Sequence, residues 1–349
     1  MHQSDAPDGE RGAGGAVTRL SDLIRGQSSQ ESMSPDVKGL DRSFGKTGLL
    51  IPLSATSLPV AEPDWYQRAC HALQGIKRAI QTTQPWTLDE LTMVASGVVA
   101  SLRVNDKLVQ AALQHNDGDY LINNAVNVAV VSVKIAEALG YEPAKLEQVA
   151  LAGLLHDLGM FILPDALVYK AGTLTDEELQ HVREHPQHGA RLFKEVGEAY
   201  PWVGKVILQE HERRDGSGYP HQLVGDHIDE MAFVIGLADV FEAMMSTRPY
   251  RRGLSPHRAI YTLLANGKTV FPYHLLKALV DQLSIYPLGT TVRLNTGETG
   301  VVSRLNRQYP LRPILQVSQQ AASAHASASK TVDLRAETSL HIVEVVPIG

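Results

Sequence analysis

A histidine and an aspartate stand side by side at one point of this 349-residue chain, in otherwise apolar surroundings. His156 and Asp157 follow the run LAGLL, which is typical of the end of a buried helix. Burying an imidazole and a carboxylate together is unfavourable unless something pairs with them. A metal ion meets this need, because both groups ligate Fe, Mn or Zn and one carboxylate can bridge two ions. Taken alone, the pair is equally consistent with a polar helix cap.

Three further residues of ligand type lie in separate segments. His185 opens HPQHG, His211 lies in QEHERRDGSGYP, and Asp239 lies in GLADVFEAMM. One such residue is usually a satisfied polar group in a core. Several residues on different apolar helices are better explained by one convergent site. The sequence therefore predicts a metal centre.

The elements that must position these residues are helices. Apolar residues recur at helical spacing in the following ranges: 65–80, 106–113, 122–139, 142–158, 202–211 and 228–246. Three further helices are predicted from signals at their N-terminal ends. Two have a capping-box signature, Thr87 with Glu90 and Thr175 with Glu178, and the third begins with the N-cap Ser255 followed by Pro256. After Pro287, short β-branched runs separated by Gly, Asn and Pro predict a small all-β region; the runs are TTVRL, TGVVSRL, PILQVS and SLHIVEVV. The Ala/Ser stretch from Gln319 to Ser329 is predicted to be a flexible loop inside this region.

Composition restricts the class of protein. The chain has 44% hydrophobic and 20% charged residues, which is typical of a soluble globular protein. A net charge of -6 argues against a general DNA or RNA binder. The sequence has neither an apolar signal segment nor a long uncharged apolar run, so we expect no membrane span. The single cysteine, Cys70, suits a reducing cytoplasm.

Four short motifs occur along the chain in an order that is typical of one protein family. HDLG, HPQHG, HERRDGSGYP and ADVFEAMMSTRPYR, spread over roughly residues 115–280, resemble the successive signatures of the HD-GYP family, a branch of the HD metal-dependent phosphohydrolases. The tail from YPLGTTVRL to RPILQV is similar to a small β-domain that follows some HD-GYP domains. The implied fold is mainly α, an HD-type helical bundle with an N-terminal helical extension and a small C-terminal all-β domain.

Four regions are expected on this basis. They are a disordered or loosely structured region (1–60), an N-terminal helical region (61–115), the HD-GYP domain (116–284) and a small β-barrel-like domain (285–349).

The resemblance also implies an activity. HD-GYP proteins hydrolyse cyclic di-GMP to pGpG or GMP with two divalent ions, Fe or Mn more often than Zn, and a metal-bridged hydroxide attacks the phosphodiester. Asp157 would bridge the ions and, with His156, form the catalytic pair. His156 and Asp239 would complete the shell of one ion, and His185 and His211 that of the other.

The same resemblance assigns substrate contacts. Tyr219 of the GYP triplet, Arg248 and Arg251 match family positions that contact phosphate or guanine. Arginine suits phosphate because its planar guanidinium can donate two parallel hydrogen bonds.

Three positions depart from the family pattern. Asn124 and Glu210 stand where histidine ligands are usual, and both are additional candidate ligands because amide and carboxylate oxygens can bind hard ions. Met160 stands where a lysine usually meets the substrate phosphate, and it supplies no charge.

Two functions from different classes follow. The preferred one is a phosphoric diester hydrolase, a cyclic di-GMP phosphodiesterase with altered metal ligation. The alternative is a degenerate module that binds cyclic di-GMP, or a partner such as a diguanylate cyclase, without turnover. Hydrolysis of another nucleotide is a third, less favoured, interpretation. The N-terminal helices, with their apolar stripes, are candidates for homodimerisation.

Overall fold

The computed structural model describes residues 64–113, 118–246, 253–283, 286, 288–306, 309, 311–318 and 329–346. The region predicted to be loosely structured (1–60) lies outside these residues, as do two predicted substrate contacts, Arg248 and Arg251.

Among the described residues, three helices precede the core helices. They are α2 (Trp65–Gln81), α3 (Asp89–Val104) and α4 (Lys107–Leu113). The side chain of Asp64 caps α2 by accepting a hydrogen bond from the Gln67 N–H, 3.1 Å away. The capping box predicted at Thr87 and Glu90 is wrong. The helix begins at Asp89, and the Thr87 hydroxyl donates instead to the Asp89 carboxylate.

The core of the helical part is formed by α5 (Tyr120–Ala138), α6 (Pro143–Leu155) and α11 (Glu230–Met245), which pack on one another. Gly140 follows α5 with φ of 77°, in the left-handed region that glycine adopts without strain. Within the described residues, α5 alone is long and apolar enough to cross a membrane, but 83% of that stretch is buried inside the protein. It is therefore accounted for as a core helix of the bundle.

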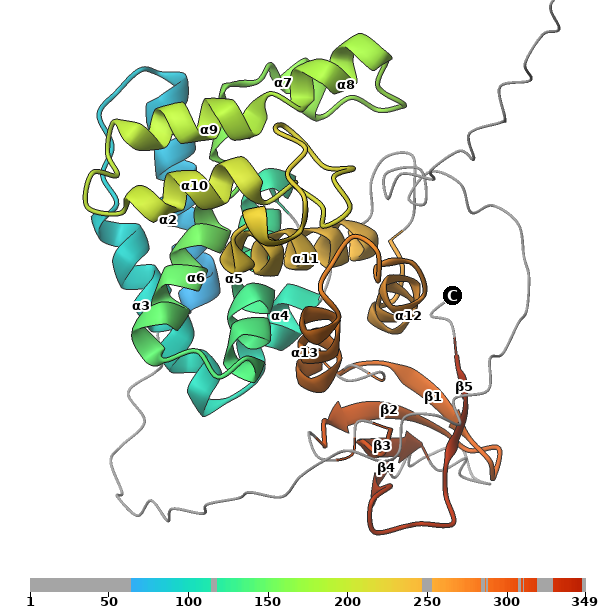
Figure 1. The fold of residues 1–349 in the computed structure, drawn as a ribbon. Coiled ribbons are helices and arrows are strands. Elements are labelled where there is room, and N and C mark those ends of the chain that lie inside the picture. The colour runs from blue at the N-terminus through green and yellow to red at the C-terminus, as the bar shows by residue number, and fades with distance from the viewer. Residues whose placement is uncertain are drawn as a thin grey trace, which may run out of the picture. The chain divides into compact units, whose positions relative to one another are not determined.

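The remaining helical elements cover this core. They are η1 (Leu158–Ile162), α7 (Asp165–Val168), α8 (Asp176–Val182), α9 (His185–Lys194), α10 (Pro201–Gln209), η2 (Gly225–His227), α12 (Pro256–Asn266) and α13 (Tyr273–Leu283). The capping box of Thr175 and Glu178 is confirmed at the start of α8, and the cap by Ser255 is confirmed at the start of α12. Helices α9 and α10 lie side by side (Figure 1).

The C-terminal part is a five-stranded antiparallel sheet in the order β4-β3-β2-β1-β5. Its strands are β1 (Thr291–Leu294), β2 (Thr299–Arg304), β3 (Ile314–Ser318), β4 (Ser329–Asp333) and β5 (Ile342–Val345). Alternate apolar residues of the strands form its core, among them Val292, Val302 and Leu315. Strand β4 was missed, because Ser329 was predicted to end a loop. The mainly α fold with a small C-terminal all-β part is confirmed, whereas the four region boundaries stay a prediction.

Candidate metal centre

The site begins where α6 ends. His156 is fully buried at the C-cap of α6, and Asp157 follows at the start of η1. The Nδ1 atom of His156 lies 2.8 Å from the carbonyl oxygen of Gly153. A backbone bond at Nδ1 directs Nε2 toward a ligand position, as in many metal-binding histidines. This Nε2 has no hydrogen-bond partner among the described groups, although Oδ2 of Asp157 and Oδ1 of Asp239 lie 3.6 and 3.8 Å away.

His185 is held in the same way as His156, with Nδ1 at a backbone carbonyl and Nε2 facing Asp157. It begins α9, and its Nδ1 lies 2.8 Å from the carbonyl oxygen of Val182. Its Nε2 lies 3.2 Å from Oδ1 of Asp157 and 3.1 Å from Nε2 of His211. The two oxygens of the Asp157 carboxylate therefore face different histidines, one on each side.

Two glycines allow the backbones to come this close. A Cβ atom on Gly159 would lie 1.9 Å from the carbonyl oxygen of His185, so α9 can pack on η1 only with glycine there. A Cβ atom on Gly236 of α11 would lie 2.1 Å from the carbonyl oxygen of Glu210. The packing of η1, α9, α10 and α11 thus depends on residues that carry no functional group.

The end of α10 supplies two more ligand-type groups. Glu210 is fully buried, with Oε1 lying 2.9 Å from Nε2 of His211 and 3.5 Å from Nε2 of His185. Its second oxygen, Oε2, has no hydrogen-bond partner among the described groups. Asp157, His185, Glu210 and His211 offer ligand atoms that all lie within 4.8 Å of one another.

Negative charge dominates the electrostatics of the cluster. Burial opposes the charged form of His156, but nearby carboxylates, Asp157 foremost, raise its pKa to about 9. The pKa of His185 is raised in the same way, against burial, by its hydrogen bond to Glu210. Burial likewise opposes ionised Glu210, yet the charge of His211 holds the pKa of that carboxyl well below its usual range. Such a cluster, with unpartnered buried nitrogen and oxygen atoms, fits a divalent metal ion.

Asn124 lies at the edge of the cluster, on α5. Its amide Nδ2 donates to Oε2 of Glu242 at 2.7 Å and lies 3.4 Å from Oδ1 of Asp239. Its Oδ1 atom is buried without a hydrogen-bond partner among the described groups. The amide thus presents its donors to the acidic pair, and only the oxygen is free to act as a ligand.

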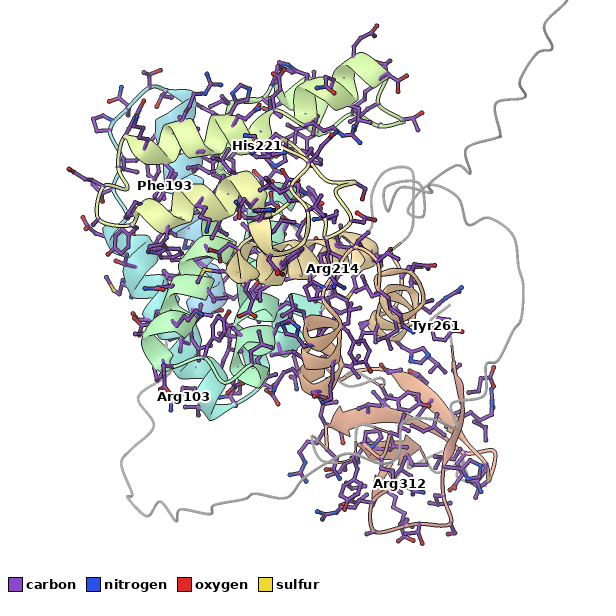
Figure 2. All side chains as sticks on the ribbon, viewed as in Figure 1. Arg103, Phe193, Arg214, His221, Tyr261 and Arg312 are labelled. Atoms are coloured by element: carbon purple, nitrogen blue, oxygen red, sulfur yellow. The ribbon has the colours of Figure 1, made fainter. Side chains whose placement is uncertain are left out.

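The loop after α10 presents Tyr219. Buried Glu212 folds this loop by accepting hydrogen bonds from the backbone N–H groups of His221 (2.7 Å) and Leu223 (2.9 Å), and His221 is labelled in Figure 2. The Tyr219 ring stacks on the ring of His211, with centroids 4.6 Å apart and planes at 19°. Burial raises the pKa of the Tyr219 phenol well above its ordinary value, so the hydroxyl remains a neutral donor.

Several residues near the site were not singled out from the sequence. The guanidinium carbon of Arg183 lies 5.4 Å from the Tyr219 ring centroid. Glu242 and Asn127 form a buried hydrogen-bonded pair beside Asn124. Glu242 could have been recognised from the sequence, since it is a second carboxylate in the apolar run that contains Asp239. Arg183 could not, because it resembles any surface arginine.

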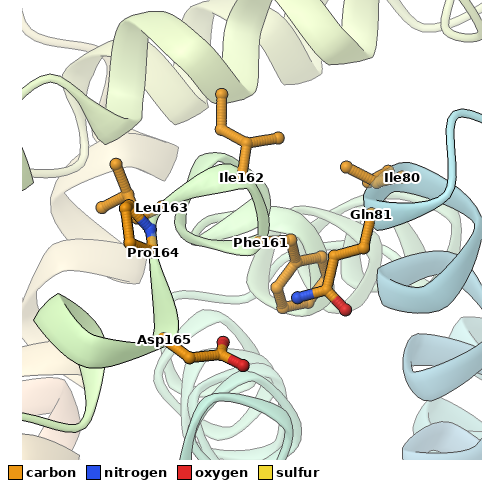
Figure 3. Close-up of a pocket in the computed structure, with 7 residues that line it drawn as sticks. All are labelled: Ile80, Gln81, Phe161, Ile162, Leu163, Pro164 and Asp165. Carbon is orange, nitrogen blue, oxygen red and sulfur yellow. The ribbon is translucent and has the colours of Figure 1, made fainter.

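A separate pocket of about 340 Å³ lies where the end of α2 meets η1 and the residues after it (Figure 3). Its lining residues are Ile80, Gln81, Phe161, Ile162, Leu163, Pro164 and Asp165. None of these belongs to the metal cluster, so this pocket is not part of the candidate centre.

The chain matches two family models. Residues 107–272 match the HD domain, and residues 291–348 match the KOW domain associated with the HD domain. The second match covers the strands of the five-stranded sheet.

Proteins with similar sequences have related names. The chain is 34% identical over 233 residues to cyclic di-GMP phosphodiesterase PA4108 of Pseudomonas aeruginosa, covering 67% of the chain and 56% of that protein. It is 36% identical over 147 residues to cyclic di-GMP phosphodiesterase response regulator RpfG of Xanthomonas campestris, covering 42% and 39%. It is 29% identical over 168 residues to 3'3'-cGAMP-specific phosphodiesterase 3 of Vibrio cholerae, covering 48% and 36%. The matches thus span about half, or less, of these relatives.

A solved structure has a similar fold. Bd1817, a HDG"Y"P protein from Bdellovibrio bacteriovorus, matches with a TM-score of 0.53 and 20% identity, over 64% of this chain and 73% of that one. The chain therefore contains an HD domain and is homologous to the HD-GYP cyclic di-GMP phosphodiesterases.

Proposed function

We propose that the protein is a metal-dependent phosphodiesterase that hydrolyses cyclic di-GMP to pGpG or GMP. The observation that carries the proposal is the position of the Asp157 carboxylate. Its two oxygens lie 3.6 and 3.2 Å from Nε2 of His156 and of His185, each of which has its Nδ1 on a backbone carbonyl. This is an arrangement suited to a carboxylate shared between two ions. His211, Asp239 and Glu210 complete the ligand set, with Asn124 beside it.

The chemistry divides between the ions and the chain. Divalent ions at this site, proposed to be Fe or Mn, supply Lewis-acid activation of water and neutralise phosphate charge. The neutral Tyr219 hydroxyl donates to a phosphate or base of the substrate. Arg183 supplies a cation close to that ring. Arg248 and Arg251 are proposed as further substrate contacts.

The names of the relatives guide the choice of the two bases in the substrate. Two of the relatives described above are named for cyclic di-GMP and one for 3'3'-cGAMP. Cyclic di-GMP is the proposed substrate because the more identical relatives carry that name. We propose a cytoplasmic location and a homodimer for the enzyme.

A second candidate function has its own support. Met160 supplies no charge at the position of the family lysine, and the Asn124 amide turns its donors toward Glu242. Both features favour a module that binds cyclic di-GMP or a signalling partner, such as a diguanylate cyclase, without turnover.

Chromatography separates the two functions. Wild-type protein and Asp157→Ala are incubated with cyclic di-GMP and, in parallel, with 3'3'-cGAMP, and linear products are quantified. The enzyme predicts linear product from cyclic di-GMP with the wild type and none with Asp157→Ala. Binding of cyclic di-GMP without product from either protein would favour the module.

A further inference from the structure

Glu242 is a buried carboxylate held by three side-chain donors. Its side chain accepts hydrogen bonds from Asn124 (2.7 Å), Asn127 (3.2 Å) and the Ser246 hydroxyl (2.6 Å). Glu242 is only 2% exposed, and no cation is paired with it within the described residues. Burial raises the pKa of its carboxyl. A charge kept in such a place must be matched by an ordered set of donors.

The hydrogen-bond network around Glu242 extends to α2, which lies outside the residues that match the HD domain. The Tyr66 hydroxyl donates to Oδ1 of Asn127 at 2.8 Å, and Tyr66 is itself buried. Because the Asn127 oxygen accepts this bond, its Nδ2 is directed at Glu242. A continuous chain of hydrogen bonds therefore runs from Tyr66 through Asn127 and Glu242 to Asn124.

Asn124 joins this chain to the metal cluster. The same Nδ2 that donates to Glu242 lies 3.4 Å from Oδ1 of Asp239, and that oxygen lies 3.8 Å from Nε2 of His156. Orientation of a ligand by groups behind it is a general feature of metal sites, and such groups affect metal affinity.

Helix α2 also contacts the segment on the other side of the centre. Its last residues, Ile80 and Gln81, share a pocket lining with Phe161 and Ile162 of η1 (Figure 3), and η1 starts directly after Asp157. One helix outside the HD match thus touches both α5, which carries Asn124, and η1, which directly follows Asp157.

We infer that Tyr66 is a positioning residue of the metal centre, so that α2, which lies outside the residues that match the HD domain, contributes to metal affinity. Tyr66 fixes the Asn127 amide, which fixes Glu242, which fixes the Asn124 amide against Asp239. Loss of the first bond lets the Asn127 amide rotate and loosens the groups behind Asp239. The inference rests on the metal centre of the proposed function and not on the identity of the substrate.

The test is removal of one hydroxyl group. Tyr66→Phe keeps the buried ring and removes the hydroxyl group that donates to Asn127. Tyr141→Phe is the matched control, because Tyr141 also donates to a carboxylate, that of Glu230, nine residues before Asp239 on α11. Nine residues of helix span about 13 Å, which places this control bond away from the cluster. For each full-length protein, Mn²⁺ affinity, the visible spectrum of the Co²⁺-loaded form and the Tm of the metal-free form are measured.

Tyr66→Phe should lose more thermal stability than Tyr141→Phe, because the bond of Tyr66 is buried and that of Tyr141 is exposed to water. Tyr66→Phe should also weaken Mn²⁺ binding by about 3–10-fold, below the ~10–100-fold typical of groups bonded directly to a ligand, and should shift the Co²⁺ bands. Tyr141→Phe should change neither metal property. Wild-type Mn²⁺ affinity and an unchanged Co²⁺ spectrum in Tyr66→Phe would overturn the inference.

The outcome is independent of turnover. These measurements contain no substrate, so a protein that binds metal but cleaves no cyclic dinucleotide would defeat the proposed function and leave the role of Tyr66 standing. Conversely, full turnover by the wild type with metal binding indifferent to Tyr66→Phe would defeat only the inference.

Discussion

The Nε2 atoms of His185 and His211 lie 3.1 Å apart, one at the start of α9 and the other just after α10. Two nitrogens that bind one ion at about 2.0–2.1 Å in tetrahedral geometry are about 3.3 Å apart. Nδ1 of His185 is held by the carbonyl oxygen of Val182, which leaves its Nε2 for such a role. The spacing of the two rings is thus close to that of ligands on a common ion.

Metal affinity should depend on pH with a defined sign. Burial lowers the pKa of His156, but the surrounding carboxylates outweigh it and raise that pKa to about 9 in the metal-free protein. A metal ion must displace this proton. Affinity for Mn²⁺ should therefore rise by about tenfold per pH unit between pH 6 and 8 for each proton displaced, as measured by titration in non-chelating buffers. An affinity that is constant over this range would contradict the assignment of His156 as a ligand.

The metal-free protein should show the opposite trend in stability. Because the folded-state pKa of His156 lies above its ordinary value of 6.5, the stabilisation from its protonation is complete below pH 6.5 and is lost as pH rises toward 9. The Tm of the metal-free protein should fall over this interval. Saturating Mn²⁺ should reduce or abolish the fall, since the ion then takes the place of the proton.

Gly159→Ala should disrupt the centre without touching a ligand. The added methyl group would lie 1.9 Å from the carbonyl oxygen of His185, so α9 must move away from η1 and His185 from Asp157. We expect a loss of about 2 kcal/mol or more in the free energy of unfolding, together with reduced metal content by elemental analysis.

The control for this substitution is Gly75→Ala in α2. Apart from the neighbouring residues and the nearby backbone of α2 itself, no atom lies within 4 Å of a Cβ built at Gly75. Alanine there should stabilise the helix by about 0.5–1 kcal/mol and leave metal content unchanged. Equal metal content in both variants would show that close packing of η1 and α9 is not needed.

Met160→Lys should raise turnover if a missing cation limits the reaction. Met160 lies in η1, three residues after Asp157, where the family resemblance expects lysine. We expect an increase in kcat/KM of about tenfold. Ile162→Lys adds the same charge two residues further on, at a side chain that is 44% exposed, and should have little effect. An equal rate in Met160→Lys and wild type would place the limiting defect elsewhere.

Arg183→Gln should weaken substrate binding and spare the metal. Removing a charge-assisted bond to phosphate should raise KM for cyclic di-GMP by about tenfold, with Mn²⁺ affinity unchanged. Arg191→Gln on α9 is the control, since Arg191 bonds to His188. An unaltered KM in Arg183→Gln would remove Arg183 from the substrate contacts.

Much of the fold could be predicted because its signals are local. The helical periodicity of 122–139 gave α5, and the pair Thr175 and Glu178 gave the cap of α8. The Thr87 signature failed since its hydroxyl bonds to the Asp89 side chain and not to a helix N–H. Strand β4 was missed because it follows an Ala/Ser-rich segment, and its pairing with β3 is a tertiary contact that no local pattern encodes.

For the candidate centre too, the residues with local sequence signals were predicted and the tertiary contacts were not. Ligand types in apolar helices drew attention to His156, His185 and Asp239. The structure brings both histidines near Asp157, and Asp239 near His156. The network behind them was not predicted. The bond from Tyr66 to Asn127 joins residues 61 positions apart and depends on how α2 packs on α5, which single-sequence patterns do not report.

The most direct test is a joint measurement of metal and product on the purified protein. Fe, Mn and Zn are quantified by elemental analysis after aerobic and anaerobic purification, and cyclic di-GMP hydrolysis is followed by chromatography on the same samples. We expect close to two ions per chain, Fe or Mn above Zn, with linear pGpG or GMP as product. Less than one ion per chain and no linear product under either condition would contradict it.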